Sequence, residues 1–390
     1  MLAATAALSC GAAPQVAQAP EATRAPPGDL QVFAEGPCPK LSIEAAGQRR
    51  FLVYGDHGRV LAGWLPGDRV ATAETLAELR GGRAHRRPSL LRGLPTDARG
   101  YVGGELRLGG SAEDPWLIRT TVRYSLVKRG PLFEREPSGY RFVSGWQPTR
   151  DPVSVPAASR GLPELPGREI CGPELDFVPL TWAATPKGGT IVAGRCDDAK
   201  AANYGVTTLM VAHGAPNATR WTIELVPFGE RLDGIVNLSL AAPSEDEIYL
   251  GAYEPFREPE QRRAFLARFD GKSWSNVETG FSDGIMSVAA DGRGTLWLAA
   301  GRALYRMKDA QLTRVPLPRL GFVSPAGPIQ VRAVRYLDGE LWVEGGYQVR
   351  LPNERGSHWA SVLFSSRRVD VPLYCDAREP AETALSEVTP

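Results

Sequence analysis

A repeat of about 45 residues in the C-terminal half of the chain constrains the fold more than any other feature. Its clearest unit spans residues 284–316 and contains four short apolar segments, separated by glycine-rich turns such as Asp291-Gly292. A second unit follows at residues 331–350, and a related one precedes both at residues 235–275. The second apolar segments of these units begin at Ile248, Leu296 and Leu341, which are 48 and 45 residues apart.

This period predicts a β-propeller. A four-stranded sheet that is apolar on both faces cannot bury both alone, so such sheets stack around an axis until the ring closes. Further candidate second strands begin at Phe51, Pro115 and Thr190, at longer spacings that imply insertions such as the proline-rich segment 148–166. We therefore expect an all-β protein, a β-propeller of six or seven four-stranded blades. The alternative is two sub-domains divided near residue 150.

One segment departs from this strand pattern. Residues Thr72 to Arg80 contain good helix formers, with Leu76 and Leu79 at helical spacing and Gly81 just beyond. These features predict a short helix inserted in the β fold.

The N-terminus indicates export. Residues 1–9 are small and apolar, and the sequence Leu8-Ser9-Cys10-Gly11 resembles the lipobox of bacterial lipoproteins, whose cysteine is acylated and becomes the new N-terminus. Ala7 stands where leucine is usual, and the alternative is a disordered start with a chance cysteine. We expect lipidation at Cys10 and anchoring in the bacterial cell envelope, at the outer membrane.

Composition then divides the chain into four parts. Residues 11–37 are rich in alanine and proline and poor in large apolar side chains, which predicts a disordered tether behind the signal and lipobox segment at 1–10. The propeller domain is expected to span residues 38–380. A disordered tail, 381–390, would follow.

The four remaining cysteines are Cys38, Cys171, Cys196 and Cys375. An even number fits two disulfides in an oxidising compartment, with three possible pairings. Because a closed ring brings the ends of the folded region together, we favour Cys38 with Cys375, and Cys171 with Cys196. The alternative is four reduced, buried thiols.

Charge and hydropathy narrow the range of partners. The chain carries 45 lysine and arginine residues against 44 aspartate and glutamate, a net charge of +1, which argues against nucleic acid as a partner. No apolar run approaches the roughly 18 residues of a membrane-spanning helix. We expect a protein or glycan ligand, with membrane contact only through the lipid anchor.

No motif in the sequence amounts to an active site. The segment 280–284, Gly-Phe-Ser-Asp-Gly, matches the pattern around a hydrolase nucleophile at Ser282, but a strand follows where that motif requires a helix. The four histidines lie far apart and the cysteine spacings do not match a zinc site, so we expect no metal and no cofactor. The histidines are His57, His85, His213 and His358.

Three further groups of residues have both a structural and a functional interpretation. The arginines Arg80, Arg83, Arg86 and Arg87 form the densest charge cluster, which could be an anion-binding loop or simply a solvated loop. Aspartates beside glycines favour turns over calcium loops. These aspartates are Asp56, Asp270, Asp291 and Asp338. Tryptophans recur in the repeat, and we expect them to pack between blades rather than bind sugars. They are Trp116, Trp297 and Trp342.

The unit at 287–299, Ser-Val-Ala-Ala-Asp-Gly-Arg-Gly-Thr-Leu-Trp-Leu-Ala, resembles the two-component-regulator propeller repeat. The element 269–274, Phe-Asp-Gly-Lys-Ser-Trp, resembles both that family and kelch-like blades. Together with the lipobox, the resemblance implies a secreted propeller lipoprotein of the kind found in myxobacteria-like organisms. It covers about the last 150 residues and implies structure, not chemistry.

These observations favour a non-enzymatic binding or scaffold protein of the cell envelope whose ligand is unknown. Two alternatives stay open. One is a propeller hydrolase or lyase acting on glycans, which would need acid and base groups drawn from several blades. The other is an extracytoplasmic sensor domain that serves a separate signalling partner.

Overall fold

The computed structural model describes 22 separate segments of the chain, and every regular element in them is a strand, which confirms the all-β prediction. None of the described residues lies in a helix. The described residues are 29–38, 41–46, 49–55, 74–80, 83–86, 105–110, 115–127, 130–142, 146–149, 176–185, 190–197, 206–214, 222–226, 232–233, 237–253, 264–281, 284–321, 325, 327–350, 358–367, 372–375 and 385–387.

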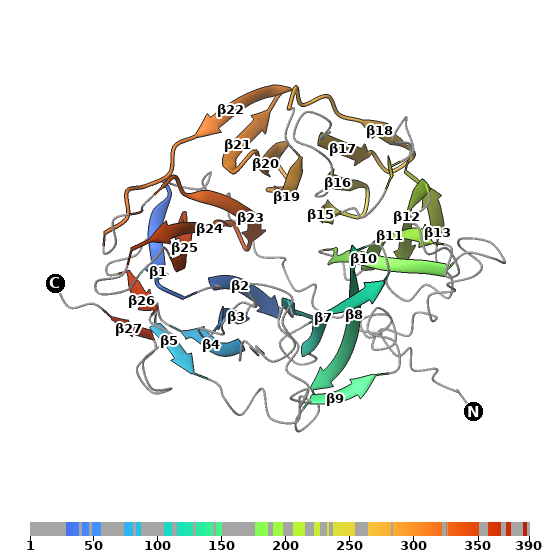
Figure 1. The fold of residues 1–390 in the computed structure, drawn as a ribbon. Coiled ribbons are helices and arrows are strands. Elements are labelled where there is room, and N and C mark those ends of the chain that lie inside the picture. The colour runs from blue at the N-terminus through green and yellow to red at the C-terminus, as the bar shows by residue number, and fades with distance from the viewer. Residues whose placement is uncertain are drawn as a thin grey trace, which may run out of the picture.

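The strands form six sheets arranged around a centre, and β2, β10, β15, β19 and β23 lie on the inside of their sheets (Figure 1). This arrangement confirms the predicted propeller. The prediction that every blade has four strands holds for four of the sheets, whereas the other two have five and six strands.

The first three sheets contain β2 to β14. The first consists of β2 (Leu41–Ala46), β3 (Arg49–Gly55), β4 (Glu74–Arg80) and β5 (Arg83–Arg86). The second consists of β6 (Glu105–Gly110), β7 (Pro115–Val127), β8 (Gly130–Phe142) and β9 (Trp146–Thr149). The third consists of β10 (Asp176–Ala184), β11 (Thr190–Asp197), β12 (Val206–Gly214), β13 (Thr222–Leu225) and β14 (Leu232–Asp233), which pairs with β12.

The last three sheets contain β15 to β27 and β1. The fourth consists of β15 (Asn237–Ser244), β16 (Glu247–Tyr253), β17 (Ala264–Phe269) and β18 (Trp274–Asn276). The fifth consists of β19 (Ile285–Ala290), β20 (Thr295–Ala300), β21 (Ala303–Lys308) and β22 (Gln311–Val315). The sixth runs β23 (Gln330–Leu337), β24 (Glu340–Val349), β25 (His358–Ser365), β1 (Gln31–Gly36), β26 (Leu373–Cys375) and β27 (Leu385–Glu387).

The sequence located the second strand of every sheet. The six segments predicted to begin at Phe51, Pro115, Thr190, Ile248, Leu296 and Leu341 lie in β3, β7, β11, β16, β20 and β24. Of these, β16, β20 and β24 are buried along most of their length because neighbouring sheets pack against both faces.

Neighbouring sheets share hydrophobic cores, and one position of the second strand recurs in them. Trp297 in β20 packs with residues of the sixth sheet, and Trp342 in β24 packs with residues of the first. Tyr249 occupies the same position in β16 and packs against the fifth sheet. The prediction that Trp297 and Trp342 fill the spaces between blades is therefore correct, whereas the side chain of Trp116 lies outside the description.

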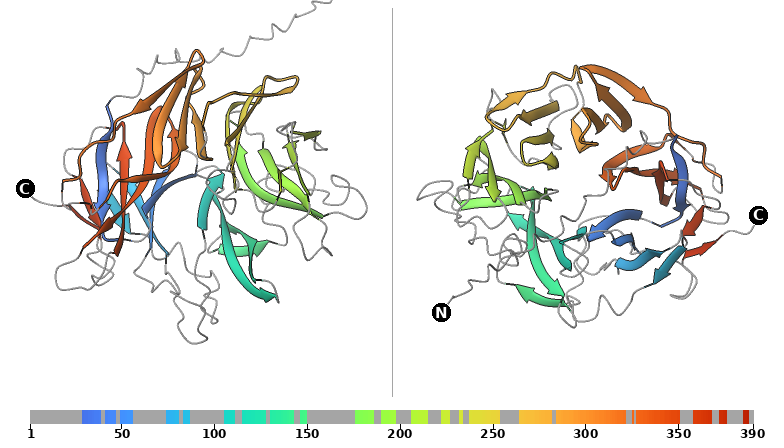
Figure 2. Two further views of the ribbon diagram at one scale, coloured as in Figure 1. Left: turned by 45° about the horizontal axis from the view of Figure 1, so that its top comes forward. Right: turned by 180° about the vertical axis from the view of Figure 1, so that it is seen from behind.

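The two ends of the chain meet in the sixth sheet. Strand β1 pairs antiparallel with β25 and parallel with β26, so an N-terminal strand completes a sheet made of C-terminal strands (Figure 2, where blue β1 stands among red strands). Cys38, which follows β1, and Cys375, the last residue of β26, form a disulfide with a Cα–Cα distance of 5.8 Å. Beside the disulfide, the rings of Phe33 and Trp342 meet edge to face at 4.9 Å between centroids.

This closure corrects two predicted boundaries. The tether was expected to reach residue 37, but Gln31–Gly36 is strand β1 because Phe33 and Ala34 bury their side chains in the core next to the disulfide. The tail was expected to span 381–390, but Leu385–Glu387 pairs with β26 as strand β27. Residues 11–28 of the tether and the other residues of the tail lie outside the described residues.

The predicted helix at Thr72 to Arg80 is wrong. Glu74–Arg80 is strand β4, which pairs with β3 on one side and with β5 on the other. A single nine-residue helix is marginal in water, and two flanking strands offer the backbone hydrogen bonds on both sides. Sheet pairing therefore outweighs the local helix propensity.

Two of the aspartates beside glycines accept backbone hydrogen bonds within their turns. The carboxylate of Asp270 accepts hydrogen bonds from the backbone N–H groups of Lys272 and Ser273, and these bonds lower the pKa of Asp270. Asp291 accepts from the N–H groups of Arg293 and Thr295 in the same way. The interpretation as turn residues is confirmed for both.

Replacing Trp297 tests the packing between sheets. The side chain is 7% exposed in a core shared by two sheets, so Trp297→Ala should lower the free energy of unfolding by about 3–5 kcal/mol in a urea titration. Met286, 38% exposed on the neighbouring strand β19, supplies the control, and Met286→Ala should change it by less than about 1 kcal/mol. Equal midpoints for the two variants would contradict the core assignment.

Candidate functional site on the inner strands

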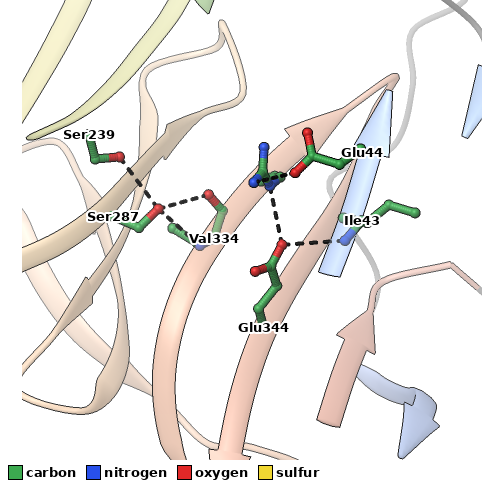
Figure 3. Close-up of polar contacts among 7 residues, drawn as sticks. Ile43, Glu44, Ser239, Ser287, Val334 and Glu344 are labelled. Atoms are coloured by element: carbon green, nitrogen blue, oxygen red, sulfur yellow. Dashed lines mark hydrogen bonds and ion pairs between the residues drawn. The ribbon is translucent and has the colours of Figure 1, made fainter. Parts of the chain in front are cut away.

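A belt of buried polar groups joins the inner strands of neighbouring sheets (Figure 3). Ser287 in β19 lies at its centre: its hydroxyl donates to the carbonyl oxygen of Val334 in β23 at 3.2 Å and accepts from the N–H of that residue at 3.1 Å. The hydroxyl of Ser239 in β15 donates to Ser287 at 3.5 Å and accepts from the N–H of Val288 at 3.0 Å. Three sheets are thereby connected through two side chains.

The belt continues through an ionic cluster into the first sheet. Arg335 in β23 contacts Glu44 in β2 at 2.8 Å and Glu344 in β24 at 3.2 Å. Glu344 also accepts a hydrogen bond from the N–H of Ile43 in β2 at 3.3 Å. Figure 3 shows both carboxylates turned toward one guanidinium, so Arg335 links the sixth sheet to the first.

The charged groups of this cluster hold neighbouring strands together. Glu44 is 2% exposed and Arg335 is 20% exposed, so both charges are withdrawn from water and depend on each other. An acid–base pair for glycoside hydrolysis needs one carboxyl group held protonated and facing the substrate. Here one guanidinium engages both carboxylates, an arrangement that suits the positioning of strands.

A second pair of titratable groups lies between the third and fourth sheets. His213 in β12 packs against the rings of Phe269 and Trp274, with centroids 5.0 and 6.4 Å away. Burial lowers the pKa of His213 to about 4, although Glu224 lies 3.6 Å from its Nε2 atom. The same carboxylate accepts a hydrogen bond from Trp274 Nε1 at 2.7 Å, so it also fixes the indole between the sheets.

The structure places some of the predicted site residues and leaves others outside its description. The predicted bridge between Cys38 and Cys375 is present. Cys196 lies in β11, but Cys171 and the lipidation residue Cys10 are outside the described residues, so the second bridge and the anchor stay predictions.

The predicted anion-binding arginines lie at the outer edge of the first sheet. Arg80 ends β4 and is paired in register with Arg83, which begins β5, while Arg86 ends β5 opposite Ala77. Arg87 lies outside the described residues. The backbone thus brings Arg80 and Arg83 opposite each other, and anion binding there stays a prediction.

The three described histidines are not brought together. His85 lies in β5, His213 in β12 and His358 in β25, each in a different sheet. His57 and Ser282 are outside the described residues. Within the part of the chain that the structure describes, no three His, Cys, Asp or Glu side chains are grouped to hold a metal ion. The described residues also include no helix that could cross a membrane.

Sequence reasoning missed the polar belt, although part of its signal was available. Ser239 and Ser287 lie 48 residues apart, the same step as the second strands Ile248 and Leu296, so an alignment of the repeats places both serines at one position. The ionic cluster has no such signal because Glu44 and Arg335 come from opposite ends of the chain.

Comparisons with known proteins give similarity of shape only. No family model matches the sequence, and no curated protein matches it. A sialidase of Trypanosoma rangeli is 11% identical with a TM-score of 0.45, over 86% of this chain and 55% of that one. YCF48 bound to a D1 peptide is 13% identical with a TM-score of 0.39, over 87% and 94%.

The polysaccharide lyase Uly1 is 9% identical with a TM-score of 0.43, over 83% of this chain and 77% of the lyase. This chain spans little more than half the length of the sialidase, since the match covers 55% of that protein. At these scores the similarities say nothing about the activity of this chain.

Removing the arginine of the ionic cluster should be costly. Arg335→Met would leave Glu44 and Glu344 without their shared partner, so the free energy of unfolding should fall by about 3–5 kcal/mol in urea. Arg268 pairs with Glu247 at the surface, and its side chain is 47% exposed, so Arg268→Met should cost less than about 1 kcal/mol. A cluster without a structural role would show no difference between the two variants.

The buried histidine predicts a loss of stability in acid. The pKa of His213 is about 4 when folded and 6.5 when exposed, so its contribution is complete above pH 6.5 and is lost as the pH falls toward 4. Between pH 7 and 4 this amounts to about 2–3 kcal/mol. Urea titrations across this range should show a shallower pH dependence for His213→Gln than for the original chain, whereas parallel curves would contradict the assignment.

Proposed function

We propose that this protein is a non-enzymatic binding or scaffold propeller of the bacterial cell envelope, anchored through lipid on Cys10. The disulfide between Cys38 and Cys375 carries the proposal. Disulfides persist in oxidising compartments outside the cytoplasm, and this one holds together the two ends of the folded chain. It is the bond that an exported ring would need, and the lipobox-like start of the sequence agrees with it.

In this proposal the six sheets act as the six blades of one closed ring, with repeats of the two-component-regulator type. Four successive hydrophobic cores support that interpretation, since they connect the third, fourth, fifth, sixth and first sheets in order. Contact between β2 and β6 extends the same sequence to the second sheet. A ring of this kind presents a rigid face made of loops and strand ends.

Binding is favoured over catalysis by what the inner strands do with their charged groups. Arg335, Glu44 and Glu344 form ion pairs with one another that connect neighbouring sheets. A rigid scaffold with paired internal charges suits the recognition of a protein or glycan by its face. The proposal includes a myxobacteria-like source, a location at the outer membrane, and a protein or glycan as the ligand.

Export and lipidation can be tested together in a Gram-negative host expressing the full chain. With an alkyne-tagged fatty acid in the medium, the original chain should be labelled and recovered with the envelope, and Cys10→Ala should lose both properties. Alkylation of thiols before and after reduction should reveal Cys38 and Cys375 only after reduction. An unlabelled, cytoplasmic protein with reactive Cys38 would refute the proposal.

The binding role needs a separate test against catalysis. The purified protein is incubated with a panel of glycans, and both retention on immobilised glycan and release of soluble products are measured. The proposal predicts retention without products. Sustained product release that exceeds a heat-denatured sample would replace the binding role with the hydrolase or lyase alternative.

A further inference from the structure

A β-bulge places one arginine in an unusual position in the sixth sheet. Along β23 and β24, Val331 is opposite Gly345 and Ala333 is opposite Glu344, so Arg332 is the extra residue between them. Bulges of this kind redirect a side chain. Arg332 lies near the start of β23, at the end of the sheet where strand β24 finishes and strand β25 begins.

The fold does not require an arginine there. The fifth sheet has the same bulge at Met286, between Ile285 and Ser287, and the third sheet has it at position 180, between Pro179 and Thr181. Methionine and leucine occupy these equivalent positions. The bulge therefore recurs in three of the sheets, and only the sixth of these carries a positive charge there.

Arg332 and Trp359 converge over a glycine. The guanidinium carbon of Arg332 lies 4.5 Å from the centroid of the Trp359 ring. A Cβ atom added to Gly346 would lie 2.6 Å from Trp359 Nε1 and 2.8 Å from that guanidinium carbon, so both donor groups lie directly above Gly346. Glycine at this position leaves the space that the two side chains fill.

Both groups are donors without acceptors in the part of the chain that the structure describes. The indole N–H of Trp359 is buried there and has no hydrogen-bond partner. Among the described residues Arg332 has no carboxylate within ion-pair distance, and burial lowers its pKa. Glu344 is near enough to oppose that shift, but it is ion-paired with Arg335. A partly buried guanidinium and an indole N–H thus lie together above Gly346 with hydrogen bonds to give.

We propose that Arg332 and Trp359 form a binding site for a single carboxylate group of the ligand, which rests on the proposed binding role and specifies its chemistry. A planar guanidinium matches the two oxygens of a carboxylate, and the indole N–H adds a third donor. One negative charge neutralises one arginine. A sulfate or phosphate dianion would add a second charge close to Glu344 and bind less well.

The test measures binding of small probes to the purified full chain by calorimetry. Glucuronate and N-acetylglycine represent carboxylates of a sugar and of a peptide end, and glucose and sulfate are the matched neutral and dianionic compounds. The site predicts binding of glucuronate, N-acetylglycine or both, and tighter than glucose or sulfate. Which of the two carboxylates binds better identifies the source.

Variants separate a binding role from a structural one. Arg332→Gln should weaken carboxylate binding about tenfold or more, while the melting temperature stays the same or rises because a desolvated charge is removed. Trp359→Phe keeps the ring and removes the N–H, so it should weaken binding about threefold to tenfold. Arg306, exposed on β21, supplies the control, and Arg306→Gln should bind as the original chain does.

Two results would overturn the site: no carboxylate binding by the original chain, or equal binding by Arg332→Gln. If the protein is still exported and retained on a glycan, only the carboxylate site fails and the binding role stands. Release of products from glycans would instead remove the binding role, whatever Arg332 does.

Discussion

The structure depends on the joining of its two chain ends in the sixth sheet. Strand β1 inserts between β25 and β26, so an N-terminal strand pairs with C-terminal strands, and the Cys38–Cys375 disulfide holds it there. The core beside the disulfide includes Phe33 and Trp342, so the covalent and apolar contributions act at one place.

Polar contacts reinforce the same junction. Arg335 connects the sixth sheet to β2, and Arg50 in β3 forms an ion pair with Asp338 in the turn between β23 and β24. Glu35 in β1 accepts a hydrogen bond from the N–H of Gly321, which follows the fifth sheet. Residues about 290 positions apart in sequence are thereby held together, so positions at this junction should respond to one another's substitution.

The sequence predicted the features that repeat or that follow from topology. Aromatic residues such as Trp297 recur at one position of the repeat, and the pairing of Cys38 with Cys375 follows from the closure of a ring. Features that depend on pairing with another strand were not predictable from one segment. The local sequence of β4 predicts a helix, and its pairing with β3 and β5 is not visible in that sequence. The bulge at Arg332 was missed for the same reason, since it exists only in the register of β23 with β24.

Urea unfolding of the purified full chain, compared with that of the Cys38→Ser, Cys375→Ser double variant, tests the closure most directly. The bridge spans 337 residues, and constraining so long a loop should contribute about 3–5 kcal/mol to the free energy of unfolding. We expect the double variant to unfold at a clearly lower urea concentration, and reduction of the original chain to have the same effect. Identical midpoints for the two proteins would show that the ring does not depend on the junction of its ends.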